Sequence, residues 1–280
     1  MKSLLIGLLG AMAMSVATPA LTKDWTDVVI GMDLSYKPWA FTDSDGTFMG
    51  FEVDLANDLC GRMKVKCELT SQAWDSIIPS LEAGKFDAII AGMAITPKRL
   101  EVIDFSIPYA DSPRVLLTLK DSPYAKLALS DKIFDIENGG DEAKQQIEML
   151  RTELKGATLG VLTATANVKF IETYLGDVVE VRQYKTAEQY VLDLAAGRID
   201  VALDNLAYLG GVLTGPDGGD MVIVGPKLSG GMFGVGRGVG LRKSDTDLKA
   251  LFDKAIEEAK QDGTIAKISD KWFGVNVAPQ

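Results

Sequence analysis

Residues 81–90 read LEAGKFDAII, and a close copy of them, LAAGRIDVAL, occurs at residues 194–203. Each copy has the pattern of a helix end, a glycine, one cation and an aspartate that opens an apolar run. Glycine suits the left-handed residue after a helix, and a cation is favourable near the negative end of the helix dipole. The apolar runs are too short for helices and are typical of strands buried on both faces. The pattern predicts two related α/β lobes, with chance recurrence of a common helix-turn-strand unit as the alternative.

The two copies also predict where a ligand would bind. In open α/β sheets, ligands lie beyond the carboxyl ends of the strands. Those ends are Ala91-Gly92 in the first copy and Asp204-Asn205 in the second. We expect them to face each other across a cleft between the lobes.

Residues 1–20 have the pattern of a secretory signal peptide. Lys2 supplies a positive start, residues 4–14 are apolar, and small residues follow, with Ala17 and Ala20 as alternative cleavage positions. The apolar run is too short to span a bilayer permanently. We therefore expect export to the periplasm, with an uncleaved anchor as the alternative.

The composition excludes several classes of function. The 280-residue chain has 39 acidic and 29 basic residues and no histidine. An acidic chain without a basic cluster argues against nucleic acid as a partner. The absence of histidine removes Ser-His-Asp and Cys-His nucleophile systems and the usual zinc sites. We expect neither a metal nor any other cofactor.

The two cysteines, Cys60 and Cys67, lie close together in the sequence. In an exported protein this spacing predicts a local disulfide. Two thiols without histidine make a poor metal site, so we expect the bridge to be structural.

The hydrophobic pattern divides the chain into lobe 1, residues 24–112 and 228–280, and lobe 2, residues 113–227. The glycine-rich stretch 229–240 is expected to be a connection, because it precedes a strand instead of opening a helix as a dinucleotide fingerprint would. The strands that we expect are 28–31, 66–69, 88–91, 158–162, 178–181 and 201–203. The longer helices are expected at 74–83, 142–154, 167–174, 187–195 and 247–260.

Arg99 is the strongest single candidate for ligand recognition. It follows the first repeat's strand, in a turn that Thr96-Pro97 starts as N-cap and first helical residue. A guanidinium beside a helix N-terminus is suited to binding a carboxylate with two hydrogen bonds. An ordinary surface arginine is the alternative.

Other candidates fall on the same predicted edge of the sheets. Asp33, Tyr36, Trp39 and Trp74 lie on loops after early strands, and aromatic faces with a carboxylate make a cage for an extended cation. Packing of aromatics at the rim is the alternative, most of all for Trp39. Gly92 permits close backbone approach. Thr165 and Asn205 are placed to offer donors from the second lobe.

Runs along the whole mature chain carry a family resemblance: 50–55 (GFEVDL), 74–81 (WDSIIPSL), 86–93 (FDAIIAGM), 95–99 (ITPKR), 238–243 (GVGLRK), 262–264 (DGT) and 271–273 (KWF). The chain resembles the family 3 solute-binding proteins of bacterial ABC importers for polar amino acids. It looks most similar to the lysine/arginine/ornithine, histidine and opine (octopine, nopaline) binders. The resemblance implies a two-lobed type II periplasmic binding protein fold, with mixed sheets flanked by helices and a ligand cleft between the lobes.

The resemblance also implies roles for individual residues. Arg99 would hold the ligand carboxylate, helped by backbone N–H groups near Ala94 and Thr165. Asp33 would meet a distal ammonium or guanidinium. The aromatic rings of Tyr36 and Trp74 would enclose the ligand's stem. Carbonyls near Ala91 and Gly92 would accept from its α-amino group, and Leu162 and Asn205 would complete the second wall.

Two positions depart from the family pattern. Many relatives have Ser or Thr where this chain has Ala94, and Asp where it has Asn205. Asp204, one residue earlier, is expected to point to the other side of a regular strand. Loss of that carboxylate should weaken binding of a free α-ammonium group, and opine-type binders look similar at this point.

The function that we expect is capture of a basic or polar amino acid, or of an opine derived from one, by a monomeric non-enzymatic protein. It would deliver the ligand to an inner-membrane permease driven by a separate ATPase subunit. One alternative is an exported carboxylate-assisted dehydratase on the same fold. Another is a ligand-sensing module for a membrane receptor.

Overall fold

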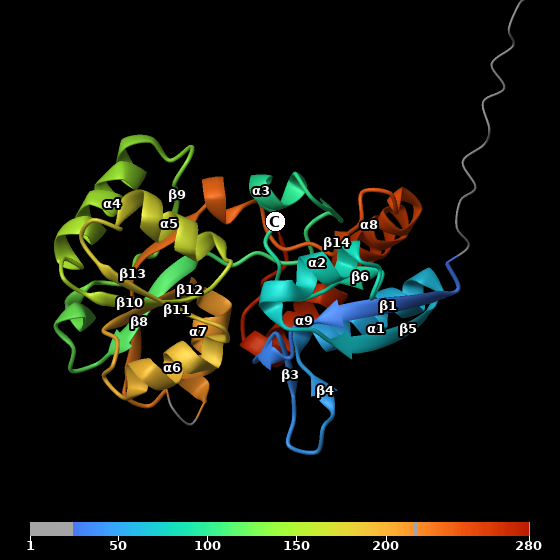
Figure 1. Ribbon diagram of the computed structural model, residues 1–280, viewed down its shortest axis with the longest axis horizontal. Coiled ribbons are helices and arrows are strands. Elements are labelled where there is room, and N and C mark those ends of the chain that lie inside the picture. Colours follow the sequence, from blue (N-terminus) through green and yellow to red (C-terminus); the bar gives the residue numbers. More distant parts are fainter. Residues whose placement is uncertain (1–24, 216–217, 280) are drawn as a thin grey trace, which may run out of the picture.

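The computed structural model describes residues 25–215 and 218–279, and the predicted signal peptide lies outside them. Figure 1 shows two α/β lobes side by side, each built around its own sheet. None of the helices in the described part of the chain has the length and apolarity needed to cross a membrane.

Lobe 1 contains a five-stranded mixed sheet in the order β5-β1-β6-β14-β7. Strand β1 is parallel to β5 and β6, whereas β14 is antiparallel to β6 and β7. The strands are β1 (Asp27–Met32), β5 (Lys66–Ser71), β6 (Ala88–Ile89), β7 (Asp104–Phe105) and β14 (Gly240–Leu241). Its helices are α1 (Phe51–Met63), α2 (Ile77–Glu82), α3 (Pro97–Leu100), α8 (Thr246–Gln261) and α9 (Thr264–Phe273). A small second sheet has the strands β2 (Ser35–Tyr36), β3 (Ala40–Thr42) and β4 (Phe48–Met49).

Lobe 2 contains a six-stranded mixed sheet in the order β11-β10-β12-β8-β13-β9. In Figure 1, α4 and α5 lie on one side of these strands and α6 and α7 on the other. The strands are β8 (Arg114–Leu119), β9 (Ile133–Asp135), β10 (Thr158–Leu162), β11 (Glu180–Tyr184), β12 (Val201–Asn205) and β13 (Met221–Ser229). The helices are α4 (Gly140–Glu153), α5 (Ala166–Tyr174), α6 (Ala187–Ala195) and α7 (Leu206–Thr214). The predicted α/β class with mixed sheets and flanking helices is confirmed.

The internal repeat occupies equivalent places in the two lobes. The repeat strands β6 and β12 each have a parallel neighbour on one side and an antiparallel neighbour on the other. The glycines Gly84 and Gly197 are both left-handed, with φ of 73° and 65°. The cation after each glycine donates its backbone N–H five residues back, closing the same helix-ending motif.

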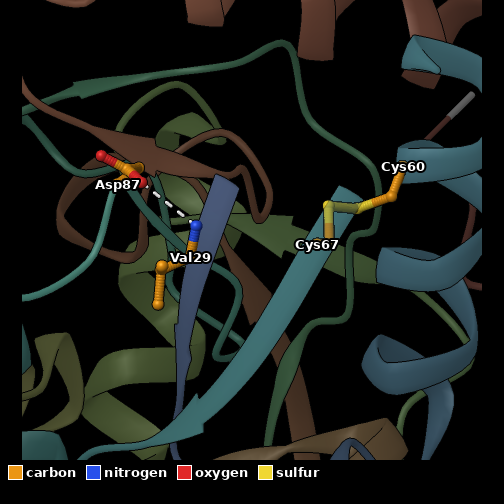
Figure 2. The surroundings of a disulfide bond; sticks show 4 residues. All are labelled: Val29, Cys60, Cys67 and Asp87. Carbon is orange, nitrogen blue, oxygen red and sulfur yellow. Dashed lines mark hydrogen bonds between the residues drawn. A yellow bond between two sulfur atoms is a disulfide. The ribbon is translucent and has the colours of Figure 1, made fainter. Parts of the chain in front are cut away.

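The aspartate of each copy ties its strand to the adjacent strand of the sheet. Asp87 Oδ2 accepts from the backbone N–H of Val29 at 3.1 Å, as Figure 2 shows. Asp200 Oδ2 accepts from the backbone N–H of Thr158 at 2.7 Å. In both lobes the aspartate thus satisfies a backbone N–H of the neighbouring parallel strand, which accounts for the same residue type opening both apolar runs.

The chain crosses between the lobes twice, before β8 and after β13. The two crossings run side by side, because Ala110 on the first and Arg237 on the second form an isolated antiparallel bridge. The backbone N–H of Arg237 donates to the carbonyl of Ala110 at 2.7 Å. The strands of the second sheet start at Arg114 and end at Ser229.

The structure departs from the sequence reading at several elements, among them β11 and α7. The strand predicted at 178–181 is found at Glu180–Tyr184, paired in register with β10. Helix α7 was not predicted, because its sequence contains two adjacent glycines, which disfavour helix. Asn205 starts this helix as its N-cap, with Oδ1 accepting from the backbone N–H of Tyr208 at 2.9 Å.

The predicted disulfide is present between Cys60 at the end of α1 and Cys67 on β5, as Figure 2 shows. It joins a helix of lobe 1 to the edge strand of the sheet beneath it. The bridge closes a short loop that includes the left-handed residue Lys64. It therefore fixes the helix-to-strand turn.

We expect the double variant Cys60→Ala/Cys67→Ala to lower the free energy of unfolding by about 2–3 kcal/mol, because the unfolded chain regains the entropy of the opened loop. Urea unfolding followed by circular dichroism measures this. Since these are the chain's two cysteines, reduced wild type is the matched control and should unfold like the variant. An unchanged midpoint in both would show that the bridge contributes nothing.

Candidate functional site

One pocket lies between the two lobes at the carboxyl ends of their strands. It is lined from lobe 1 by the ends of β1, β6 and the turn before α3, and from lobe 2 by the ends of β10 and β12. All ten residues predicted for the ligand site line it: Asp33, Tyr36, Trp74, Ala91, Gly92, Ala94, Arg99, Leu162, Thr165 and Asn205. Five further residues complete the wall: Arg114, Ala166, Asn167, Asp204 and Arg237.

Arg99 reaches the pocket from the short helix α3. Thr96 caps this helix, and Pro97 occupies its first turn, as the sequence predicts. The guanidinium donates to the carbonyl of Ala94 at 2.9 Å and, across the cleft, to the carbonyl of Ala164 at 3.4 Å. It also lies over the ring of Trp74, 5.1 Å from the centroid. Among the described residues it forms no ion pair with a carboxylate.

The positive charge of Arg99 sits in an unfavourable setting. Burial lowers the pKa of its guanidinium to about 10, and repulsion from Arg114 and Arg237 acts in the same direction. The group stays protonated at neutral pH. Helix α5 begins at the same wall with Thr165 as its N-cap, and its dipole adds positive potential there. This end of the pocket is therefore built for an anion.

Asp33 supplies a carboxylate to the pocket from the end of β1. Its side chain is buried, and Oδ1 accepts from the backbone N–H and the hydroxyl of Ser35 at 3.1 and 2.7 Å. Burial raises the pKa of this carboxyl above its ordinary value, although the Ser35 hydrogen bonds oppose the rise. A cationic ligand group beside Asp33 would restore the charged form.

Trp74 and Tyr36, the two aromatic residues of lobe 1 that line the pocket, each form a hydrogen bond across the cleft. Trp74 Nε1 donates to the carbonyl of Thr163 at 3.1 Å. The hydroxyl of Tyr36 donates to Asp204 Oδ1 at 2.7 Å, and its ring stacks on Tyr208 with centroids 4.2 Å apart. One face of Tyr36 is thus covered by lobe 2. Trp39, the weakest of the aromatic candidates, is fully buried and does not line the pocket.

The expectation that Asp204 points away from the cleft is wrong. Asp204 and Asn205 both line the pocket, because the strand alternation ends where Asn205 turns the chain into α7. Asp204 accepts from the hydroxyls of Tyr36 and Tyr190 at 2.7 and 2.5 Å and from the backbone N–H of Asn205 at 2.7 Å. Its oxygens are largely occupied by the protein. Neither residue offers a free carboxylate for a ligand ammonium group.

Three important residues escaped the sequence reading: Glu52, Arg114 and Arg237. Arg114 opens β8 at the first crossing, and Arg237 lies within the glycine-rich second crossing. For both arginines, a cation within a crossing segment between the lobes was the feature of the sequence that could have indicated a role in the site. Glu52 belongs to the family-like run GFEVDL, where a carboxylate in the first turn of a helix has an ordinary explanation.

Glu52 supports the pocket from behind. It is fully buried, and its Oε1 accepts from the backbone N–H of Gly92 at 2.5 Å and from the hydroxyl of Tyr109. Gly92 is left-handed, with φ of 61°, and a Cβ there would lie 3.5 Å from the ring of Tyr36. Glu52 therefore fixes the glycine turn that forms one wall of the site.

Burial raises the pKa of the Glu52 carboxyl to about 7, while the hydrogen bonds from Tyr109 and Gly92 and the attraction of Arg237 limit the rise. Its Oε2 has no hydrogen-bond partner. At pH values between 4.5, the ordinary pKa of the carboxyl, and about 7, the folded protein therefore holds a proton on Glu52 that the unfolded chain releases. The carboxyl lowers stability progressively as pH rises through this range.

We expect Glu52→Gln to remove part of the pH dependence of stability. Between pH 5 and 7.5 the wild type should lose about 2 kcal/mol more unfolding free energy than the variant, because the amide does not ionise. Urea unfolding at a series of pH values measures the difference. Glu101→Gln, at an exposed position of the same lobe, is the control and should follow the wild type. Parallel curves for wild type and Glu52→Gln would contradict this account.

The chain is similar to known proteins along most of its length. The family model of bacterial extracellular solute-binding proteins, family 3, matches residues 28–275. The octopine-binding periplasmic protein of Rhizobium meliloti is 39% identical over 90% of this chain and 92% of its own length. The lysine/arginine/ornithine-binding periplasmic protein of Escherichia coli (strain K12) is 37% identical, over 98% of this chain and 96% of its own.

A solved structure shares the fold across nearly the whole chain. It is a periplasmic His/Glu/Gln/Arg/opine family-binding protein from Silicibacter pomeroyi in complex with lysine. Its TM-score is 0.72 at 30% identity, and the match covers 90% of this chain and all of the other. The two-lobed arrangement of the described residues is therefore that of a periplasmic binding protein.

Proposed function

The chain belongs to the bacterial extracellular solute-binding proteins, family 3, and we propose that its ligand is a basic amino acid or an opine derived from one. It is a substrate-binding component of an ABC importer that works in the periplasm, and it is a binding protein, not an enzyme. The alternatives of a dehydratase or of a module for a membrane receptor are less supported, because the curated relatives are amino acid- or opine-binding proteins.

The observation that carries the ligand proposal is the unpaired guanidinium of Arg99. Its hydrogen bonds go to one carbonyl from each lobe, and no carboxylate of the described residues forms an ion pair with it. A partly buried cation without an ion-pair partner favours an anionic ligand group, and a guanidinium binds a carboxylate with two hydrogen bonds. Asp33 supplies the opposite charge elsewhere on the wall, which suits the cationic end of a basic side chain.

The remaining roles follow from the same pocket. Tyr36 and Trp74 enclose the apolar stem of the ligand, and the backbone near Ala91, Gly92 and Ala94 contacts its amino-acid end. Leu162, Thr165 and Asn205 act from lobe 2. Ligand contacts from both lobes favour the closed arrangement over an open one. No covalent step is needed.

The protein acts as a monomer with lobe 1 at 24–112 and 228–280 and lobe 2 at 113–227. A signal peptide at residues 1–20 directs its export. The closed form then docks on an inner-membrane permease driven by a separate ATPase subunit, without nucleic acid, metal or cofactor.

A thermal-shift panel of L-arginine, L-lysine, L-ornithine, L-histidine, octopine and nopaline tests the ligand class. At least one member should raise the melting temperature, since a ligand at 100 times its Kd stabilises the folded state by about 2.7 kcal/mol. Succinate and glucose serve as controls and should give no shift. A panel without any shift would sink the proposal.

Arg99→Ala should weaken binding of the active panel member by at least about 30-fold, because a ligand carboxylate would lose a partner worth roughly 2 kcal/mol or more. Isothermal titration calorimetry measures the affinity. Lys98→Ala is the matched control, since Lys98 is exposed on the same helix and does not line the pocket. Near-normal affinity in Arg99→Ala would remove Arg99 from the site.

A further inference from the structure

Arg237 is held firmly at the floor of the cleft. Its backbone forms isolated antiparallel bridges with Ala94 on one side and Ala110 on the other. The N–H of Arg237 donates to Ala110 at 2.7 Å, and its carbonyl accepts from Tyr109 at 2.8 Å. The side chain therefore starts from a fixed point on the second crossing between the lobes.

The side chain of Arg237 is buried, with the residue 2% exposed, and its Nε lacks a hydrogen-bond partner. Within the described part of the chain it has no ion pair, and its single recorded side-chain contact is stacking over Trp39, 4.7 Å from the ring centroid. Such stacking covers a face of the guanidinium and leaves its in-plane N–H groups free to donate. Arg237 lines the ligand pocket.

Arg114 brings a second buried guanidinium to the same pocket from the first crossing. It is 7% exposed, and it donates to Asn167 Oδ1 at 3.1 Å and to the carbonyl of Ser112 at 2.9 Å. Both acceptors are neutral. Burial lowers the pKa of this guanidinium to about 10, and repulsion from the nearby Arg237 acts in the same direction, whereas the charge of Asp204 opposes the shift.

The carboxylates of the pocket are occupied elsewhere. Asp33 is held by Ser35, and Asp204 accepts from Tyr36, Tyr190 and the N–H of Asn205. Glu52, behind the wall, attracts Arg237 electrostatically, but among the described residues the two form no ion pair. The pocket thus presents three guanidinium groups and two carboxylates. An amino acid with a single carboxylate would neutralise one of the three.

We propose that Arg237, together with Arg114, forms a second anion-binding subsite that receives an additional carboxylate of the ligand. The chain then prefers N-carboxyalkyl amino acids to the parent amino acid, and Arg237 is the residue that determines this preference. The inference rests on the proposed function. It also accounts for Asn205, because a ligand whose amine carries a carboxyalkyl group has less need of a free carboxylate at that position.

Titration calorimetry with L-arginine and octopine tests this, because octopine is arginine with a carboxyethyl group on the α-nitrogen. Wild type should bind octopine at least about tenfold more tightly than L-arginine. Arg237→Met should lose about 30-fold or more in octopine affinity and less than about threefold for L-arginine. Arg237→Lys keeps the charge without the forked geometry and should lose an intermediate amount for octopine alone. Lys243→Met removes an exposed cation just beyond β14, outside the pocket lining, and should change neither affinity.

Equal losses for both ligands in Arg237→Met would mean that Arg237 only supports the fold, and unchanged octopine affinity would mean that it does not touch the ligand. Either result overturns the inference and leaves the proposed function intact, as does a wild type that prefers L-arginine. Circular dichroism checks that Arg237→Met is folded, and if it is not, the Arg237→Lys comparison decides. A wild type that binds no basic amino acid and no opine overturns the proposed function, and the inference falls with it.

Discussion

The organising constraint of this molecule is positive charge that is largely removed from water and, among the described residues, forms no ion pair with a protein carboxylate. Arg99, Arg114 and Arg237 converge on one pocket, and their hydrogen bonds go to carbonyls or to a neutral amide. Removing an ion from water is costly unless it is paired. The folded protein tolerates the arrangement because backbone bridges, aromatic faces and two sheets hold these side chains in place. In the proposed function, an anionic ligand offsets this cost, and the charges then contribute to its affinity.

The two-lobed fold that positions these charges could largely be predicted from the sequence. The repeat at 81–90 and 194–203 predicted two lobes, and the strand-end rule placed the two carboxyl ends opposite each other. That rule, with the family resemblance, gathered ten residues that the fold does bring to one pocket. These predictions relied on local signals in the sequence: a glycine after a helix, the end of a strand, and a proline in the first turn of a helix.

The rest depended on packing between distant segments, which a local pattern does not report. Arg237 looked like a polar residue in a glycine-rich connection, yet bridges to Ala94 and Ala110 bury it. Asp204 was misplaced because regular alternation was assumed up to the end of β12, where a capping asparagine redirects the chain. Glu52 was hidden by an ordinary alternative, since acidic residues are common at helix starts. Burial of a charged group is a tertiary property, and it is also what makes these three residues important.

The bridge between Ala110 and Arg237 bears on how the lobes move. Two separate connections would let one lobe roll and twist on the other, but segments hydrogen-bonded to each other bend as one ribbon. We therefore expect the lobes to move relative to each other mainly by bending about one hinge. Because Arg237 lies on one of these paired segments, a ligand that contacts this arginine contacts the hinge directly. Ligand contact and the relative orientation of the lobes would therefore depend on the same segment.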